Sequence, residues 1–233
     1  MSFLEIEGVE TYYGQSHILQ GVDLEVNEGE VVALLGRNGV GKTTTLRSIL
    51  QLTPPRSGSI RFRDEELVGK DTHEVAGAGI GWIPEGRRMF SRLSVEENIR
   101  AAVADSEGVD AALETAYETF PILRERQGQR AGTLSGGQQQ MLAIARALVG
   151  GPDLLLVDEP SEGVQPSIVQ SITEDLKEIN EEFDTTILFV EQNLSVIRGL
   201  ADRCYAIDRG TIVDEITGDA VSDGDNLEEY LVV

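Results

Sequence analysis

Apolar and polar positions follow two different patterns along this chain. Residues 1–33 alternate between the two, as in Val22-Asp23-Leu24-Glu25-Val26, which is typical of antiparallel strands with one face in water. Residues 31–35, 154–157 and 186–190 instead form short apolar runs, as expected of strands buried on both faces. Because helical patterns alternate with these runs, the sequence predicts an α/β fold whose mainly parallel sheet is covered by helices.

A mainly helical stretch interrupts this pattern between residues 85 and 149. Within it, Ser94 and Glu97 have the spacing of a helix capping box. We interpret the chain as a single domain, residues 1–233, with a helical subdomain inserted into an α/β core that carries an antiparallel β segment near the N-terminus. The core comprises residues 1–84 and 150–233, and the inserted subdomain comprises residues 85–149. Helices are predicted over residues 42–52, 110–119 and 136–149, and a turn at Ser57-Gly58-Ser59 before an alternating segment at 60–63.

The composition is strongly acidic. The 233 residues include 41 Asp and Glu against 19 Lys and Arg, giving a net charge of −22, and only three of the basic residues are lysines. Such a charge disfavours nonspecific binding to DNA or to anionic membranes, so no nucleic-acid partner is expected. Few lysines among many acids suggest a cytoplasm rich in salt, where repulsion is screened; an ordinary acidic protein is the alternative.

Membrane, secretion and disulfide signals are missing from the sequence. The apolar runs fall far short of the roughly 18 residues that a membrane helix needs, and the start Met1-Ser2-Phe3-Leu4-Glu5 does not read as a signal peptide. The single cysteine, Cys204, excludes an internal disulfide, and two distant histidines argue against a histidine metal site. These features predict a soluble, cytoplasmic protein.

A phosphate-binding loop follows the first buried strand. The pattern G-x-x-x-x-G-K-[ST] is met by Gly36, Arg37, Asn38, Gly39, Val40, Gly41, Lys42 and Thr43. Glycines let successive backbone N–H groups face the phosphates, and the N-terminus of the next helix favours an anion there. Lys42 is expected to neutralise the β- and γ-phosphates, and the Thr43 hydroxyl to bind Mg²⁺.

Two acids end the second buried strand. In Leu154-Leu155-Leu156-Val157-Asp158-Glu159, the strand delivers Asp158 to the edge of the sheet, where a carboxylate can hold Mg²⁺. Glu159 is then placed to orient or deprotonate an attacking water. Together with the upstream loop, this strand end predicts phosphoryl-transfer chemistry.

A second candidate anion site lies in Leu134-Ser135-Gly136-Gly137-Gln138. Ser135 is interpreted as a helix N-cap, and together with the N–H groups of Gly136 and Gly137 it has the means to bind an anion. One domain does not need two such sites for one nucleotide. Two copies facing head to tail would use both.

The chain resembles the ATP-binding subunits of ABC transporters over essentially its entire length. The phosphate-binding loop, the Leu-Ser-Gly-Gly-Gln signature and the Asp-Glu strand end occur in the order and at the spacing of that family. The resemblance implies a P-loop ATPase with ATP and Mg²⁺, whose nucleotide contacts include Thr44, Ser135 to Gln138 of a second ATPase subunit, and an aromatic on adenine. Tyr13 occupies that aromatic position, with Tyr12 as the fallback. It also implies two membrane permease subunits, an external solute-binding protein as an indirect partner, and a place at the cytoplasmic face of the membrane.

Three positions depart from the general family pattern. Glu85 stands where most members have a glutamine that contacts Mg²⁺ or the attacking water, and Gln192 stands where most have a histidine. Glu85 adds a negative charge beside ATP, whereas Gln192 donates a hydrogen bond to the γ-phosphate but does not become cationic. Gln165 replaces an aspartate often found in the loop that faces the partner subunit.

The same positions narrow the branch of the family. Pro-Glu-Gly-Arg-Arg at 84–88 and Val-Glu-Gln-Asn at 190–193 resemble the LivF-type subunits of branched-chain amino acid importers. Gly-Arg-Asn-Gly-Val-Gly-Lys at 36–42 and Ser-Glu-Gly-Val-Gln-Pro-Ser at 161–167 are similar to the branch that imports urea and short-chain amides. Both solutes stay open here, as does an ABC ATPase that works without a transporter.

Overall fold

The computed structural model describes residues 2–87, 89–103, 108–218, 220–221 and 227–231. Arg88, the second arginine of the Pro-Glu-Gly-Arg-Arg segment, lies outside them. Within the described residues, no helix is both long and apolar enough to cross a membrane.

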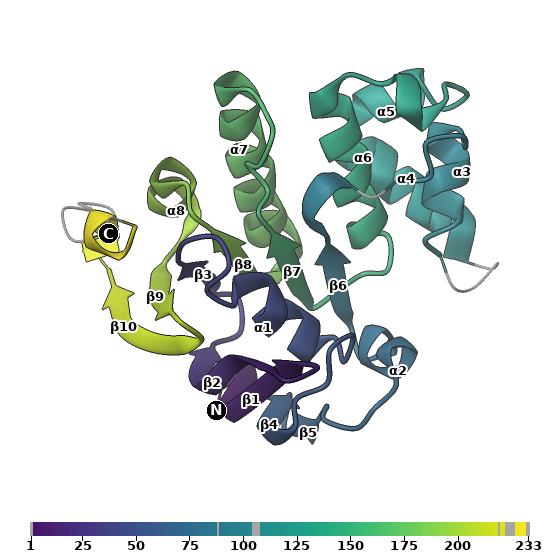
Figure 1. Ribbon diagram of the computed structural model, residues 1–233. Coiled ribbons are helices and arrows are strands. Elements are labelled where there is room, and N and C mark those ends of the chain that lie inside the picture. The colour runs from purple at the N-terminus through teal and green to yellow at the C-terminus, as the bar shows by residue number, and fades with distance from the viewer. Residues whose placement is uncertain (1, 88, 104–107, 219, 222–226, 232–233) are drawn as a thin grey trace.

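Two β-sheets form the centre of the molecule (Figure 1). The antiparallel sheet has the strand order β2-β1-β4-β5: β2 is Ser16–Val26, β1 Leu4–Tyr13, β4 Ser57–Phe62 and β5 Glu65–Glu66. The second sheet has the order β10-β9-β3-β8-β7-β6: β10 is Thr211–Thr217, β9 Arg203–Asp208, β3 Val31–Leu35, β8 Thr186–Glu191, β7 Leu154–Asp158 and β6 Ile80–Ile83. Its strands are parallel except for β10, which runs antiparallel to β9. The predicted fold class is therefore confirmed.

Alternate residues of the central strands enter two separate hydrophobic cores. In β3, Val31, Ala33 and Leu35 pack into one core, and Val32 and Leu34 into the other. Successive side chains of a strand point to opposite faces, so an unbroken apolar run is what a sheet covered on both faces requires. β7 and β8 divide their side chains between the two cores in the same way.

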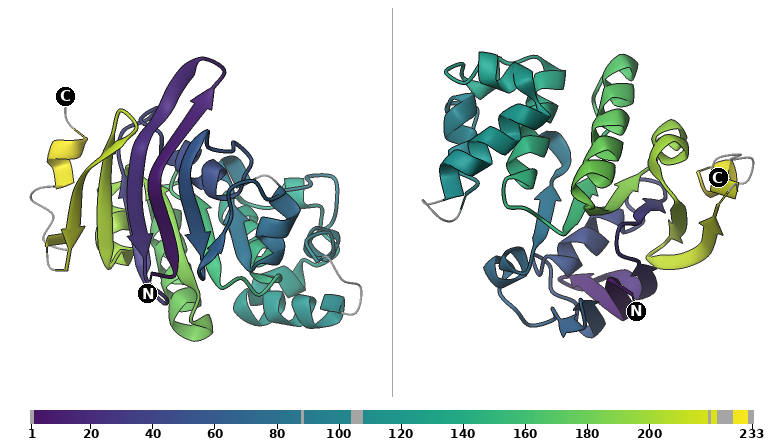
Figure 2. Two further views of the ribbon diagram at one scale, coloured as in Figure 1. Left: turned by 90° about the horizontal axis from the view of Figure 1, so that it is seen from below. Right: turned by 180° about the vertical axis from the view of Figure 1, so that it is seen from behind.

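Helices and the antiparallel sheet cover the two faces of the parallel sheet. On one face lie α6 (Gly136–Leu148), α7 (Pro166–Phe183) and α8 (Leu194–Leu200), and on the other lie α1 (Lys42–Ile49) and the antiparallel sheet (Figures 1 and 2). Cys204 is completely buried in the first core, and burial raises the pKa of its thiol to about 12.

The residues between β6 and β7 are mainly helical, and most of these helices lie to one side of the sheets (Figure 1). Ser94 caps α3 (Val95–Arg100). Its hydroxyl accepts from the Glu97 N–H at 3.1 Å, and the Glu97 carboxylate accepts from the Ser94 N–H at 2.7 Å. Short helices complete this segment: η1 is Glu85–Arg87, α4 Val109–Thr119, α5 Pro121–Glu125 and η3 Ala131–Thr133. Outside this segment, α2 is Thr72–Gly77 and η4 Leu227–Tyr230.

Two local predictions were wrong. Ser57-Gly58-Ser59 forms the start of β4 instead of a turn, because Ser57 pairs with Glu10 and Ser59 with Glu7 of β1. Gly58 has φ 96, and a Cβ there would lie 2.6 Å from the Gly8 carbonyl oxygen, so glycine permits this close strand pairing. The helix expected to reach residue 52 ends at Ile49, and Gln51 has a positive φ of 55.

Candidate active site

The phosphate-binding loop links the buried strand β3 to α1. Gly41, the last residue before the helix, has φ 122, and a Cβ there would lie 2.8 Å from Leu19. A Cβ on Gly36 would lie 2.6 Å from the Ile207 carbonyl oxygen. The positive φ of Gly41 and the close packing at Gly36 and Gly41 therefore require glycine, which explains why the motif specifies glycine at these positions.

Lys42 is turned into the loop. Its side chain is only 3% exposed, and its ammonium donates to the carbonyl oxygens of Gly36 at 2.8 Å and Arg37 at 3.1 Å. The Glu159 carboxylate, 9% exposed, lies 3.0 Å from the same nitrogen. The expected phosphate-binding cation and the expected catalytic base therefore form a buried ion pair. Sequence reasoning missed this pair, because 117 positions separate two residues that only the folded sheet brings together.

Asp158 and Thr43 meet at the carboxyl end of the parallel sheet. β7 ends at Asp158, and the Thr43 hydroxyl donates to its carboxylate at 2.9 Å. Burial raises the pKa of Asp158, and the charges on Glu85 and Glu159 also raise it. A nearby divalent cation would favour the ionised carboxylate.

These donors fit Mg²⁺ that is shared with a nucleotide. Among the described residues, no three His, Cys, Asp or Glu side chains converge closely enough to hold a metal ion alone. Mg²⁺ is usually bound through one or two carboxylates together with substrate phosphates. The Asp158 carboxylate and the Thr43 hydroxyl supply the protein's part of that arrangement.

Glu159 has an unusual backbone conformation. Its φ is 45, in the left-handed region that residues other than glycine adopt at a cost. Its N–H donates to the Val190 carbonyl oxygen at 3.1 Å, just beyond the last paired residue of β7. The neighbouring strand β8 thereby fixes the direction in which this residue leaves the sheet.

A cavity of about 250 Å³ opens beside the loop. It is lined by Tyr13, Ile18, Gly39, Gly41, Lys42, Thr43, Thr44 and Glu159. Tyr13 is 43% exposed, and its hydroxyl lies 3.2 Å from that of Thr53 and accepts from Arg47 at 3.3 Å. The Tyr12 ring is already stacked on His17, with centroids 4.2 Å apart, and has the Arg56 guanidinium 4.0 Å from its centre. The structure thus favours Tyr13 over Tyr12 as the ring available to a base.

Glu85 and Gln192 follow β6 and β8, two strands of the parallel sheet that are separated by β7. Glu85 follows β6, is exposed and shares a hydrogen bond with Glu162 that raises the pKa of Glu162. Gln192 follows β8, is half-buried, and lines a cavity of about 360 Å³ with Arg37, Asn38 and Leu231. The structure therefore places Gln192 beside the loop, and Glu85 within electrostatic range of Asp158.

The residues from Ser135 to Gln138 form their hydrogen bonds with one another. Ser135 is the N-cap of α6: its hydroxyl accepts from the Gln138 N–H at 3.3 Å, and its N–H donates to the Gln138 side chain at 3.1 Å. The N-cap prediction is confirmed. None of these residues lines either cavity beside the loop, so one chain does not bring its own two candidate anion sites together.

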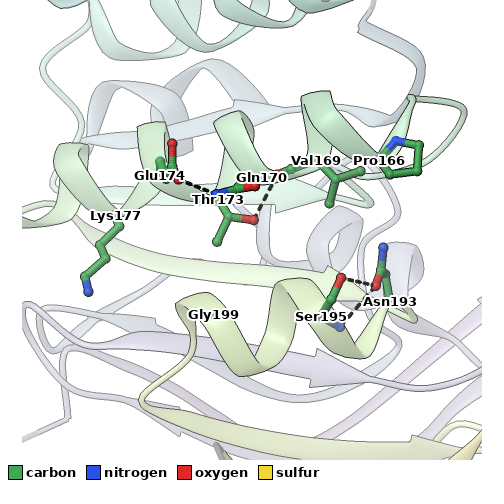
Figure 3. Close-up of a pocket in the computed structure, with 9 residues that line it drawn as sticks. All are labelled: Pro166, Val169, Gln170, Thr173, Glu174, Lys177, Asn193, Ser195 and Gly199. Carbon is green, nitrogen blue, oxygen red and sulfur yellow. Dashed lines mark hydrogen bonds between the residues drawn. The ribbon is translucent and has the colours of Figure 1, made fainter.

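Another cavity lies away from the phosphate-binding loop. It has a volume of about 570 Å³ and separates α7 from α8 (Figure 3). Figure 3 shows Asn193 and Ser195 hydrogen-bonded at the start of α8, opposite Gln170 and Thr173 of α7. The side chains predicted to bind phosphate do not line it.

Comparison with known proteins decides the family. The model of the ABC transporter family matches residues 19–162, more than half of the chain. This chain belongs to the ABC transporter family. It is 46% identical over 220 residues to the high-affinity branched-chain amino acid transport ATP-binding protein BraG of Pseudomonas aeruginosa, with 94% of each protein covered. It is 33% identical over 219 residues to the probable branched-chain amino acid transport ATP-binding protein LivF of Archaeoglobus fulgidus, with 93% of each covered.

Solved structures of ABC proteins share the whole fold. A nucleotide-free ATP-binding cassette from an ABC transporter superposes with a TM-score of 0.89 at 25% identity, and all of both chains is covered. A dimeric ATP-binding cassette in a post-hydrolysis state, bound to ADP and Pi, gives a TM-score of 0.80 at 26% identity, covering 92% of this chain and 98% of the other. The predicted resemblance to ABC transporter ATP-binding subunits of the LivF type is confirmed.

Proposed function

We propose that this chain binds and hydrolyses ATP to power the import of branched-chain amino acids through partner permeases. The observation that carries the ATPase assignment is the convergence of Lys42, Thr43 and Glu159 on one cavity, with the Asp158 carboxylate hydrogen-bonded to Thr43. The solute assignment rests on the 46% identity to BraG across 94% of both chains, since the nucleotide site itself carries no information about the solute.

In the proposed reaction, the loop binds the phosphates of ATP and Tyr13 stacks on the adenine. The N–H groups from Gly39 to Thr44 face the phosphates, and Lys42 exchanges its contact with Glu159 for the β- and γ-phosphates. This exchange frees the Glu159 carboxylate to orient or deprotonate the attacking water. Binding of the substrate thus prepares the catalytic base.

Mg²⁺ would be held by Thr43 and Asp158 and would neutralise charge that develops on the phosphates. Glu85, whose charge acts on Asp158, would contact the ion or the attacking water. Gln192, beside Arg37 and Asn38, would donate its amide N–H to the γ-phosphate. Because an amide does not titrate, Gln192 positions this group without transferring a proton.

A second ATPase subunit completes each site in this proposal. Ser135, Gly136, Gly137 and Gln138 lie outside the cavities around the chain's own loop, so a head-to-tail partner would have to supply them to the γ-phosphate. The dimeric cassette bound to ADP and Pi has this chain's fold, which supports dimerisation. ATP-driven closure and reopening would move two permease subunits at the cytoplasmic face of the membrane, and an external solute-binding protein would deliver the amino acid.

The test is uptake in cells that carry or lack this chain. Deletion should abolish ATP-dependent uptake of labelled leucine, isoleucine and valine, and the wild-type gene should restore it while the Glu159→Gln variant should not. Loss of urea or acetamide uptake with normal leucine uptake would overturn the solute assignment. Normal uptake of all these solutes, together with ATPase activity of the purified chain, would indicate an ATPase that works without a transporter.

A further inference from the structure

A buried carboxylate outside the predicted site joins two of its segments. Glu191 is the last residue of β8 and is 1% exposed. One of its oxygens accepts from the Ser161 N–H at 3.1 Å and from the Ser161 hydroxyl. The other accepts from the N–H groups of Gln192 at 2.6 Å and Asn193 at 2.7 Å. Four donors therefore converge on a single side chain.

Within the part of the chain that the structure describes, the four donors that Glu191 accepts from are N–H and O–H groups, and none of the four belongs to a cation. Burying a carboxylate without a cation is costly unless its oxygens are fully hydrogen-bonded. An ionised carboxylate offers about four lone-pair sites and no donor, which matches this set of four donors. The four donors therefore require a carboxylate as their acceptor, although burying that carboxylate costs free energy.

The segments that Glu191 joins are those that carry the reaction. Ser161 lies two residues beyond Glu159, and Gln192 directly follows Glu191. The two segments leave the adjacent strands β7 and β8, between which the Glu159 N–H also bonds to Val190. Asn193 strengthens the connection, since its side-chain amide donates to the Ser161 hydroxyl at 3.4 Å and its oxygen caps α8 (Figure 3).

We propose that Glu191 is a positioning residue for ATP hydrolysis, which holds the Ser161 segment and Gln192 as one unit so that Glu159 and Gln192 approach the γ-phosphate together. The inference rests on the proposed ATPase function and deepens it. Glu191 is too deeply buried to reach the substrate and acts only through the backbone groups that it binds. Disturbing it should therefore impair turnover more than nucleotide binding.

Glu191→Gln is the direct test, because it keeps the size of the side chain but replaces one acceptor oxygen with an NH₂ that faces two donors. The full-length protein should lose kcat by about 10- to 100-fold, the effect of a small misplacement of reacting groups, while KM for ATP changes less than about threefold. Ser161→Ala removes a single O–H donor and should lower kcat in the same direction by a smaller factor. In a Gln192→Ala background, Glu191→Gln should cost much less than alone, because both changes affect the same group.

Glu30→Gln is the matched control. Glu30 is a half-buried acid with several bonds, to Arg203 at 2.7 Å and to the Asn27 N–H at 2.9 Å, and it directly precedes β3, at the end of that strand opposite to the phosphate-binding loop. It should lower the melting temperature without changing kcat. If kcat of both Glu191→Gln and Ser161→Ala stays within twofold of wild type, or if the losses of Glu191→Gln and Gln192→Ala simply multiply, the inference is overturned. Glu159→Gln in the same series tests the ATPase proposal separately: if wild type and Glu159→Gln hydrolyse ATP equally, that proposal fails whatever Glu191 does.

Discussion

Glu159→Gln should tighten nucleotide binding while it abolishes turnover. In the structure, the Glu159 carboxylate lies 3.0 Å from the Lys42 ammonium, where a phosphate has to bind. A glutamine of the same size removes the charge that competes with the nucleotide. It also removes one negative charge near Asp158 and Glu162. Burial is the main cause that raises the pKa of Asp158, and a hydrogen bond with Glu85 is the main cause that raises the pKa of Glu162, but the charge of Glu159 raises both. Both effects should tighten nucleotide binding.

The size of the effect follows from the contact. A hydrogen bond to a charged group contributes about 1.5–3 kcal/mol, and these two side chains are only 3% and 9% exposed. Lys42 keeps the carbonyl oxygens of Gly36 and Arg37 as partners in the variant, so the lower end applies. About 1.5 kcal/mol corresponds to binding that is roughly tenfold tighter. Loss of the base should lower kcat by about 10²- to 10⁴-fold.

Titration of the purified chain with fluorescent ADP measures the affinity without interference from hydrolysis. Glu162→Gln is the control, since Glu162 is an exposed acid of the same cluster, whereas the partners of the Lys42 ammonium among the described residues are Glu159 and the carbonyl oxygens of Gly36 and Arg37. It should tighten ADP binding less than about threefold, as expected of a screened surface charge. If Glu159→Gln binds ADP no more tightly than Glu162→Gln does, the ion pair does not oppose nucleotide binding and the reasoning is refuted.

The remaining predictions concern affinity, stability and assembly. Lys42→Ala should lose nucleotide binding in the same titration, and unchanged affinity would contradict the assignment of the loop. Burial, with the charges of Glu178 and Glu174, raises the pKa of Asp175 from 3.8 to about 6. As the pH rises, Asp175 therefore ionises in the unfolded chain before it ionises in the folded one. The charged side chain thus destabilises the fold above about pH 6 and has no such effect below about pH 4. Asp175→Asn should therefore raise the free energy of unfolding at pH 7.5 by about 1 kcal/mol, after allowance for partial exposure, and denaturant melts should show this gain shrinking toward pH 5. Mixing Lys42→Ala with Ser135→Ala subunits should restore partial ATPase activity if one intact site forms between them, whereas either variant alone should be inactive. With a net charge of −22, the melting temperature should rise from low salt to molar KCl as repulsion is screened, and a flat or falling series would remove the salt-adaptation hypothesis.

Features encoded by neighbouring residues were predicted well. The phosphate-binding loop, the Asp158-Glu159 strand end and the N-caps Ser94 and Ser135 all depend on local backbone geometry, which a short motif specifies. The apolar runs of β3, β7 and β8 were equally clear, because burial on both faces favours apolar side chains.

Features that depend on contacts between residues far apart in the sequence were not predicted. The ion pair between Lys42 and Glu159 exists only because β3 and β7 end at the same edge of the sheet, on either side of β8. Glu191 looks like an ordinary polar residue after an apolar strand, and its role becomes visible only when Ser161 is seen to bond to it. The strand β4 was mistaken for a turn at Ser57 because pairing with β1 overrides the local preference of Ser-Gly-Ser.

The burial of Cys204 has a practical consequence for experiments on this protein. A thiol that is shielded from solvent, and whose pKa burial raises to about 12, reacts very slowly with maleimides. Since Cys204 is the chain's only cysteine, we expect thiol-reactive dyes to label the native protein very little. Cysteines introduced one at a time near the phosphate-binding loop and near the start of α6 could carry a donor and an acceptor, and fluorescence energy transfer between two labelled copies would then report subunit closure directly.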